Sequence, residues 1–187
     1  MHLKVALALA AAVPALFAVP GIAQDQQSQE AALAEKVVNN TNPASFQAYG
    51  FASKPKLVKD EAVQGGRALR LPVSGEGNPW SMGVNVPLLK PVKAGDRLVL
   101  AFYVRLDKAE GGATTAKLAG AQIQLSAAPY TAIFGKGFDV TPEWKFLQVS
   151  GKVDKDYPAG ALSAAFHVNT GKQVLDLGPV AVVNLGQ

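Results

Sequence analysis

Three stretches of the sequence alternate between apolar and polar side chains, and their polar members are of types that can bind a ligand. The stretches are 97–106, 116–125 and 161–169. Residues i and i+2 of a β-strand point to the same face, so each stretch would bury an apolar stripe and present a polar one. The chemically capable residues on the polar stripes are Tyr103, Arg105, Gln122, Gln124, His167 and Asn169.

These residue types suit the recognition of a sugar. Amide, guanidinium and imidazole groups hydrogen-bond with hydroxyls, and an aromatic ring covers the apolar C–H face of a sugar ring. We therefore expect Tyr103 and Arg105 to form the strongest pair of a binding cleft if the strands are neighbours in one sheet. The alternative interpretation of each stripe is a plain solvated sheet face. A lone histidine such as His167 is more often a surface or packing residue than a ligand or catalyst.

Three further aromatic residues are candidates for either packing or binding. Trp80 has the parity of the apolar residues at 82–86, which favours core packing, and stacking on a sugar ring is the alternative. Tyr130 lies in a loop of small residues, 127–138, where loops often carry binding residues, so we expect it at the rim of the cleft. Its alternative is an aromatic tucked onto the edge of the fold. Trp144 follows a Pro-Glu turn, and we expect it to pack in the core or at an edge.

Catalytic constellations are scarce in this chain. It has no cysteine, which excludes disulfides, thiolate nucleophiles and iron–sulfur clusters. It has two histidines, too few for a His-rich metal site. The best acidic pairs are Asp139 with Glu143 and Asp154 with Asp156. Both pairs flank turns, where carboxylates usually serve solubility, and neither resembles the converging pair of a glycosidase. We expect a protein that is not an enzyme.

Length and charge narrow the class of protein further. The chain has 187 residues, of which 49% are hydrophobic, and this suits one domain with a proper core. Its 18 basic and 14 acidic side chains give a net charge of +4 and are scattered along the chain. A nucleic-acid-binding protein would cluster its basic residues, so we do not expect a nucleic-acid partner.

The segment 1–23 reads as a cleaved signal peptide. It has a lysine near its start, an apolar run of about 15 residues and small residues before Gln24. The run is short for a transmembrane helix, which needs about 20 residues, so we expect no membrane span. This pattern predicts a periplasmic or secreted protein.

The rest of the chain divides into a polar leader, 24–36, and one all-β domain, 37–187. Short runs rich in Val, Leu, Phe and Tyr are separated by Gly, Pro, Asn and Asp, which is typical of a β-sandwich or barrel. The expected strands are 45–51, 56–59, 68–73, 80–86, 97–106, 116–125, 134–140, 145–153, 161–169 and 174–183.

Four motifs in this domain resemble a known family. The stretch 78–106, NPWSMGVNVPLLKPVKAGDRLVLAFYVRL, is similar to the core of carbohydrate-binding modules of the family 4/9/22 type. The stretches 65–73, 140–153 and 172–186 resemble other strands of the same modules, in the same order. The resemblance implies a galactose-binding-like β-sandwich jelly roll that binds oligosaccharides or polysaccharides in a cleft on one sheet. It also implies a glycan-degrading enzyme as a partner.

The resemblance further implies a structural calcium ion between the first and last strands. The closing acidic residue of the family corresponds to Asp176, which we therefore expect to be a metal ligand. The segment 37–42 lacks the glutamate that opens the family pattern.

Taken together, these observations predict an exported, non-catalytic protein that holds a polysaccharide on one sheet face. The alternative is a structural or partner-binding β-sandwich without sugar affinity, and a small glycan hydrolase is a weaker third.

Overall fold

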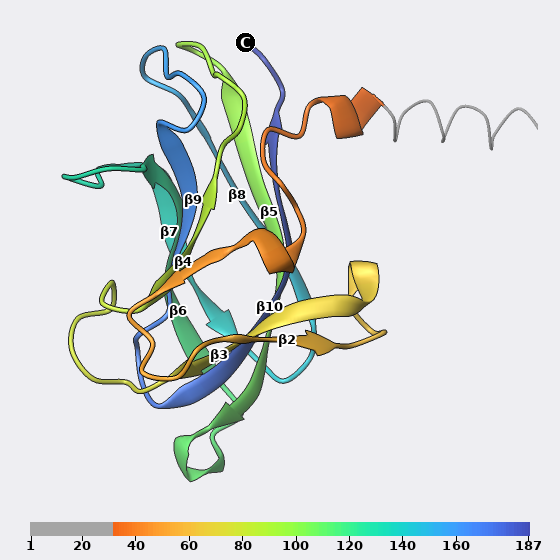
Figure 1. Cartoon of the computed structure of the whole chain (residues 1–187), viewed down its shortest axis with the longest axis vertical. Coiled ribbons are helices and arrows are strands. Elements are labelled where there is room, and N and C mark those ends of the chain that lie inside the picture. Colours follow the sequence, from red (N-terminus) through yellow and green to blue (C-terminus); the bar gives the residue numbers. More distant parts are fainter. Residues whose placement is uncertain (1–31) are drawn as a thin grey trace, which may run out of the picture. The chain divides into compact units, whose positions relative to one another are not determined.

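The computed structural model describes residues 32–187, so the expected signal peptide, 1–23, and most of the expected leader, 24–36, lie outside the described residues. Glu35–Gln187 form one unit built from two five-stranded sheets that face each other (Figure 1). Within the part of the chain that the structure describes, no helix is long and apolar enough to cross a membrane.

Sheet I contains, in spatial order, β1 (Gln47–Tyr49), β4 (Gly83–Pro87), β9 (Leu162–His167), β6 (Ala116–Leu125) and β7 (Ala132–Val140). Sheet II contains β2 (Lys56–Lys59), β3 (Arg67–Val73), β10 (Gln173–Asn184), β5 (Arg97–Ala109) and β8 (Lys145–Lys152). All neighbouring strands are antiparallel. Three short 3₁₀ segments are η1 (Pro43–Ser45), η2 (Gln64–Gly66) and η3 (Glu110–Gly112).

This architecture confirms the predicted β-sandwich jelly roll, and each expected strand is present. The largest difference concerns the strand expected at 80–86, because β4 begins only at Gly83. Pro79 and Trp80 instead form the centre of a turn that is closed by a hydrogen bond from the Ser81 N–H to the Asn78 carbonyl, 2.9 Å. Proline is favoured at the second position of such a turn. Trp80 therefore leaves the alternation that predicted core packing.

The core lies between the two sheets and joins them through aromatic contacts. Phe102 of sheet II meets Phe166 and Phe138 of sheet I edge-to-face, with ring centroids 5.0 and 5.5 Å apart. Phe102 and Phe166 are fully buried. Burial of one such side chain stabilises the fold by about 1.5–3 kcal/mol. The apolar stripes predicted from alternation therefore hold the sandwich together.

Strand β9 is buried on both of its faces. Phe166 and Ala164 point into the core, whereas Ser163 and Ala165 point outward and are still only 3% and 0% exposed. The hydroxyl of Ser163 contacts that of Ser126 at 2.7 Å. Because these outward side chains are buried, side chains from the neighbouring strands and loops must extend further outward than they do. The middle of sheet I is therefore the floor of a depression.

Candidate functional site

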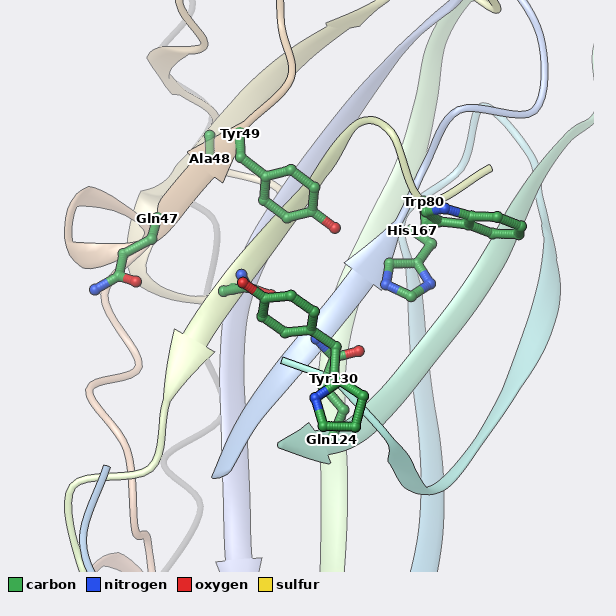
Figure 2. Close-up of a pocket in the computed structure, with 9 residues that line it drawn as sticks. Gln47, Ala48, Tyr49, Trp80, Gln124, Tyr130 and His167 are labelled. Atoms are coloured by element: carbon green, nitrogen blue, oxygen red, sulfur yellow. The ribbon is translucent and has the colours of Figure 1, made fainter. Parts of the chain in front are cut away.

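A cleft of about 750 Å³ opens on the outer face of sheet I. Its lining residues are Gln47, Ala48, Tyr49, Trp80, Asn85, Gln124, Pro129, Tyr130 and His167. Figure 2 shows Tyr49 and Tyr130 on one side of His167 and Trp80 on the other. The structure thus brings together four residues that the sequence singled out, which are Trp80, Gln124, Tyr130 and His167.

The floor beside His167 is built from glycines. His167 ends β9 and is paired with Gly83 of β4 on one side and Gly120 of β6 on the other. A Cβ on Gly83 would lie 2.5 Å from the Tyr49 hydroxyl oxygen, so only glycine leaves room for that ring. A Cβ on Gly120 would lie 3.2 Å from Oε1 of Gln122. The two glycines therefore keep the imidazole of His167 open to the cleft.

His167 offers hydrogen bonds without a charge. It is half-buried, and this burial lowers the pKa of its imidazole below the ordinary value of 6.5. At neutral pH the ring is uncharged, with one nitrogen that donates and one that accepts. This group can bind a hydroxyl in either direction.

Trp80 is exposed on a turn that the buried residue Asn169 stabilises through hydrogen bonds. The Trp80 side chain is 59% exposed. The Asn169 amide nitrogen donates to the Ser81 hydroxyl at 2.8 Å and to the Asn78 carbonyl at 3.1 Å, and it also contacts the Glu76 carbonyl. Asn169 does not line the cleft, and both ends of its amide are already bonded within the protein, so the expectation that it contacts ligand there is wrong. Its role is to position the turn that carries Trp80.

The two tyrosines of the cleft come from segments far apart in the sequence. Tyr130 lies in the β6–β7 loop with φ +55°, a left-handed conformation that is unfavourable for a tyrosine, and it is 54% exposed. Backbone strain of this kind gathers at functional sites. Burial and the nearby Tyr130 phenol raise the pKa of Tyr49 above its ordinary value, so its hydroxyl stays protonated. Both rings offer an apolar face and a polar tip.

Side-chain amides form the polar part of the floor. Gln122 and Gln124 lie on one face of β6, and Nε2 of Gln122 donates to Oε1 of Gln124 at 2.7 Å. Gln124 is 4% exposed and lines the cleft. Asn85 lies on β4, separated from Gln122 by Ala165 of β9. The oxygen Oδ1 of Asn85 is buried and has no hydrogen-bond partner among the described residues.

Tyr103 and Arg105 do not lie in this cleft, so the expectation of one common face is wrong for this pair. Both belong to β5, which pairs with β10 and β8 in sheet II, whereas β6 pairs with β9 and β7 in sheet I. The Tyr103 ring packs against Phe146, with centroids 5.0 Å apart. Alternation assigned each stripe to a face correctly but carried no information about which strands are neighbours.

Asp176 does not fit the expected role of calcium ligand. It is fully buried in β10, between Arg70 of β3 and Arg105 of β5. Its Oδ1 accepts from Arg70 Nε at 2.8 Å, and its Oδ2 accepts from Arg105 Nη2 at 2.9 Å. Two guanidinium charges already satisfy this carboxylate and would repel a cation. Within residues 32–187 no group of three acidic, histidine or cysteine side chains could hold a metal ion.

Trp144 packs at the edge of sheet II, as predicted. Its indole nitrogen donates to Oδ2 of Asp60 at 3.1 Å, and the Arg105 guanidinium lies 5.0 Å from its ring centroid. Arg105 also pairs with Asp60 at 2.9 Å. The outer face of sheet II therefore carries a structural ion network.

Sequence reasoning missed the lining residues Gln47, Ala48, Tyr49, Asn85 and Pro129. The signal for Asn85 was present, because its parity is opposite to that of the core residues Val84 and Val86. The three-residue strand β1 is too short to show a pattern, and this hid Tyr49.

No family model and no curated protein sequence matches the chain. Solved structures do match it. One described as "CBM4 structure and function" has a TM-score of 0.58 and 17% identity over 76% of this chain and 96% of that one. The CBM22-1 xylan-binding domain of Xyn10C from Paenibacillus barcinonensis has a TM-score of 0.56 and 16% identity, over 81% and 93%. The N-terminal cellulose-binding domain of β-1,4-glucanase C from Cellulomonas fimi has a TM-score of 0.56 and 15% identity, over 81% and 96%.

The fold is therefore that of carbohydrate-binding modules of the 4/9/22 type. At these identities the likeness concerns the fold, and the case for a function depends on the cleft itself.

Proposed function

We propose that the protein binds an uncharged polysaccharide or oligosaccharide in the cleft of sheet I, without catalysis. The observation that carries this proposal is the composition of the cleft. Three aromatic rings, those of Tyr49, Trp80 and Tyr130, surround amide and imidazole groups (Figure 2). Rings cover the C–H faces of sugars, and amides hydrogen-bond with hydroxyls.

The charge of the lining supports an uncharged ligand. None of the nine lining residues carries a carboxylate, ammonium or guanidinium group. Burial favours the uncharged form of His167. A uronic acid or sulfated glycan would leave its charge without a counterion here, which is costly in a desolvated site.

The same lining supports binding without hydrolysis. A glycosidase needs two carboxyl groups flanking the scissile bond. The acidic residues considered from sequence, Asp139, Glu143, Asp154 and Asp156, are all absent from the lining. We further propose that the chain is exported through the signal peptide 1–23 and acts beside a glycan-degrading enzyme.

Affinity electrophoresis through gels containing soluble polysaccharides tests this function. The panel contains xylan, mixed-linkage β-glucan, xyloglucan and galactomannan. We expect retardation by one or more, and we expect Trp80→Ala to weaken it at least tenfold, since aromatic contacts are the usual hot spots of recognition.

Phe146→Ala is the matched control, because Phe146 is an equally exposed aromatic, 56%, on the other sheet. It should migrate like the wild type. Free migration of the folded wild type in every gel would overturn the proposal and favour a structural or partner-binding role.

A further inference from the structure

Asn85 carries an unpaired acceptor at the floor of the cleft. Among the described residues, two buried side-chain atoms lack a hydrogen-bond partner, Asn85 Oδ1 and Thr141 Oγ1, and of the two only Asn85 lines the cleft. Buried polar atoms in folded proteins are nearly always satisfied. A ligand hydroxyl that reaches this acceptor at the floor of the cleft can supply the missing hydrogen bond.

The opposite side of the floor offers donors. Oε1 of Gln124 already accepts one hydrogen bond from the amide of Gln122, which orients the Gln124 amide and leaves its Nε2 hydrogens to donate to a ligand. Gln122 is itself held in place by the neighbouring strand β7. It lies so close to Gly135 that a Cβ on Gly135 would collide with the Cβ of Gln122. Gln122 is therefore a positioning residue that acts through Gln124.

A small side chain separates the two groups. Ala165, between Asn85 and Gln122 on the central strand, is fully buried and projects no polar atom. Gln47, which is paired with Asn85 on β1, donates no hydrogen bond to Asn85 Oδ1. Neither neighbour supplies the missing donor to Asn85.

We propose that Asn85 selects glycans whose hydroxyl group at this position is unsubstituted, and that it rejects O-acetylated or O-methylated chains. This inference rests on the proposed sugar binding. A free hydroxyl donates its hydrogen to Oδ1, whereas an ester or ether oxygen has no hydrogen to donate and leaves the acceptor buried and unpaired. Sites built to bind a hydroxyl reject the analogue that lacks it much more strongly than apolar pockets do.

Two matched pairs of probes test this selection by affinity electrophoresis. One is water-soluble acetylated xylan before and after alkaline deacetylation, and the other is mixed-linkage β-glucan before and after chemical O-acetylation. Where the wild type binds a polysaccharide of one of these pairs, it should bind the unacetylated form at least tenfold more tightly than the acetylated form.

Variants separate the missing hydrogen bond from simple bulk. Asn85→Leu keeps the branched shape and the number of side-chain heavy atoms but removes the acceptor, so the variant should bind the two forms about equally. Gln122→Leu releases Gln124 and should weaken both forms by the same factor, which leaves the preference unchanged. Gln148→Ala, an exposed amide on sheet II, should match the wild type in every gel.

Each outcome decides the inference. Equal binding of both forms by the wild type, or an unchanged preference in Asn85→Leu, would overturn it while sugar binding itself stands. Failure of the folded wild type to bind any of the four probes would also overturn it. In that case retardation in the wider panel decides separately whether the proposed function survives.

Discussion

The side-chain amide of Asn169 donates a hydrogen bond to the hydroxyl of Ser81 at 2.8 Å, and this contact joins the segment after β9 to the turn that carries Trp80. Oδ1 of Asn169 accepts from the Gly75 N–H at 3.0 Å, so one side chain ties both ends of the β3–β4 loop. The exposed aromatic of the cleft therefore depends on a buried residue that the ligand does not touch.

Asn169→Ala should weaken both folding and binding. The variant loses several hydrogen bonds and leaves buried partners unpaired, so we expect the free energy of unfolding to fall by about 2–4 kcal/mol. Glycan affinity should fall because Trp80 is no longer held in place. Urea unfolding and affinity electrophoresis measure the two effects. Wild-type affinity in a folded Asn169→Ala protein would show that the turn is positioned by other contacts.

Substitutions of Tyr130 should separate the cost of its backbone strain from the contribution of its ring to binding. Glycine adopts φ +55° without strain, whereas alanine does not, so Tyr130→Gly should melt at a higher temperature than Tyr130→Ala. Both variants lose the ring and should bind glycan at least tenfold more weakly than the wild type. Differential scanning calorimetry compares the melting temperatures of the two variants, and gel retardation compares their glycan affinities with that of the wild type. If alanine proves the more stable of the pair, backbone strain at this position is not significant.

The fold was predictable because alternation reports burial. The stripe of Leu98, Leu100 and Phe102 in one stretch and Phe166 in another predicted strands that bury at least one face, and both pack in the core. Turn residues then predicted the strand boundaries. The largest error came where a turn lay inside an alternating run, at Pro79 and Trp80.

The site was only partly predictable because neighbours in a sheet are chosen over long sequence distances. Gln124 was found from parity, and His167 from parity together with the neighbours that the expected fold would give it. Tyr103 and Arg105 had the same local pattern but lie in sheet II, because β5 pairs with β10 and β8. No local signal distinguishes these two cases. The expected calcium ligand Asp176 failed for a related reason, since its arginine partners come from two other strands.

The Asp176 network should be essential for stability and irrelevant to sugar binding. Asp176→Asn removes the charge that two partly exposed arginines share, and we expect the free energy of unfolding to fall by about 2–4 kcal/mol. Asp156→Asn, which breaks an exposed pair with Lys93, is the control and should leave stability unchanged. Urea unfolding compares the two. Loss of glycan retardation in a still-folded Asp176→Asn protein would contradict the separation of the two faces.

His167 should make stability and binding fall in mild acid. Because burial lowers its pKa in the folded protein, the unfolded chain binds the proton more readily. The stabilisation is therefore complete above about pH 6.5, the ordinary histidine pKa, and is lost as the pH falls through the lowered value. Protonation also removes the acceptor nitrogen and places a charge in the cleft.

Melting temperatures and glycan affinities of the wild type and His167→Gln between pH 7.5 and pH 5 measure this effect, with the window set about the ordinary histidine pKa. The wild type should lose more of both quantities than the variant. Parallel curves for the two proteins would rule out His167 as the group responsible.

The most direct test of a sugar-binding cleft on sheet I uses the two tryptophans of the chain, of which Trp80 lines the cleft and Trp144 packs at the edge of sheet II. Their indole N–H signals are recorded by ¹⁵N NMR while xylohexaose or cellohexaose is added. We expect the Trp80 signal to shift and saturate with at least one of them, while the Trp144 signal stays in place. A saturating shift of Trp144 with Trp80 unmoved would contradict the proposed site.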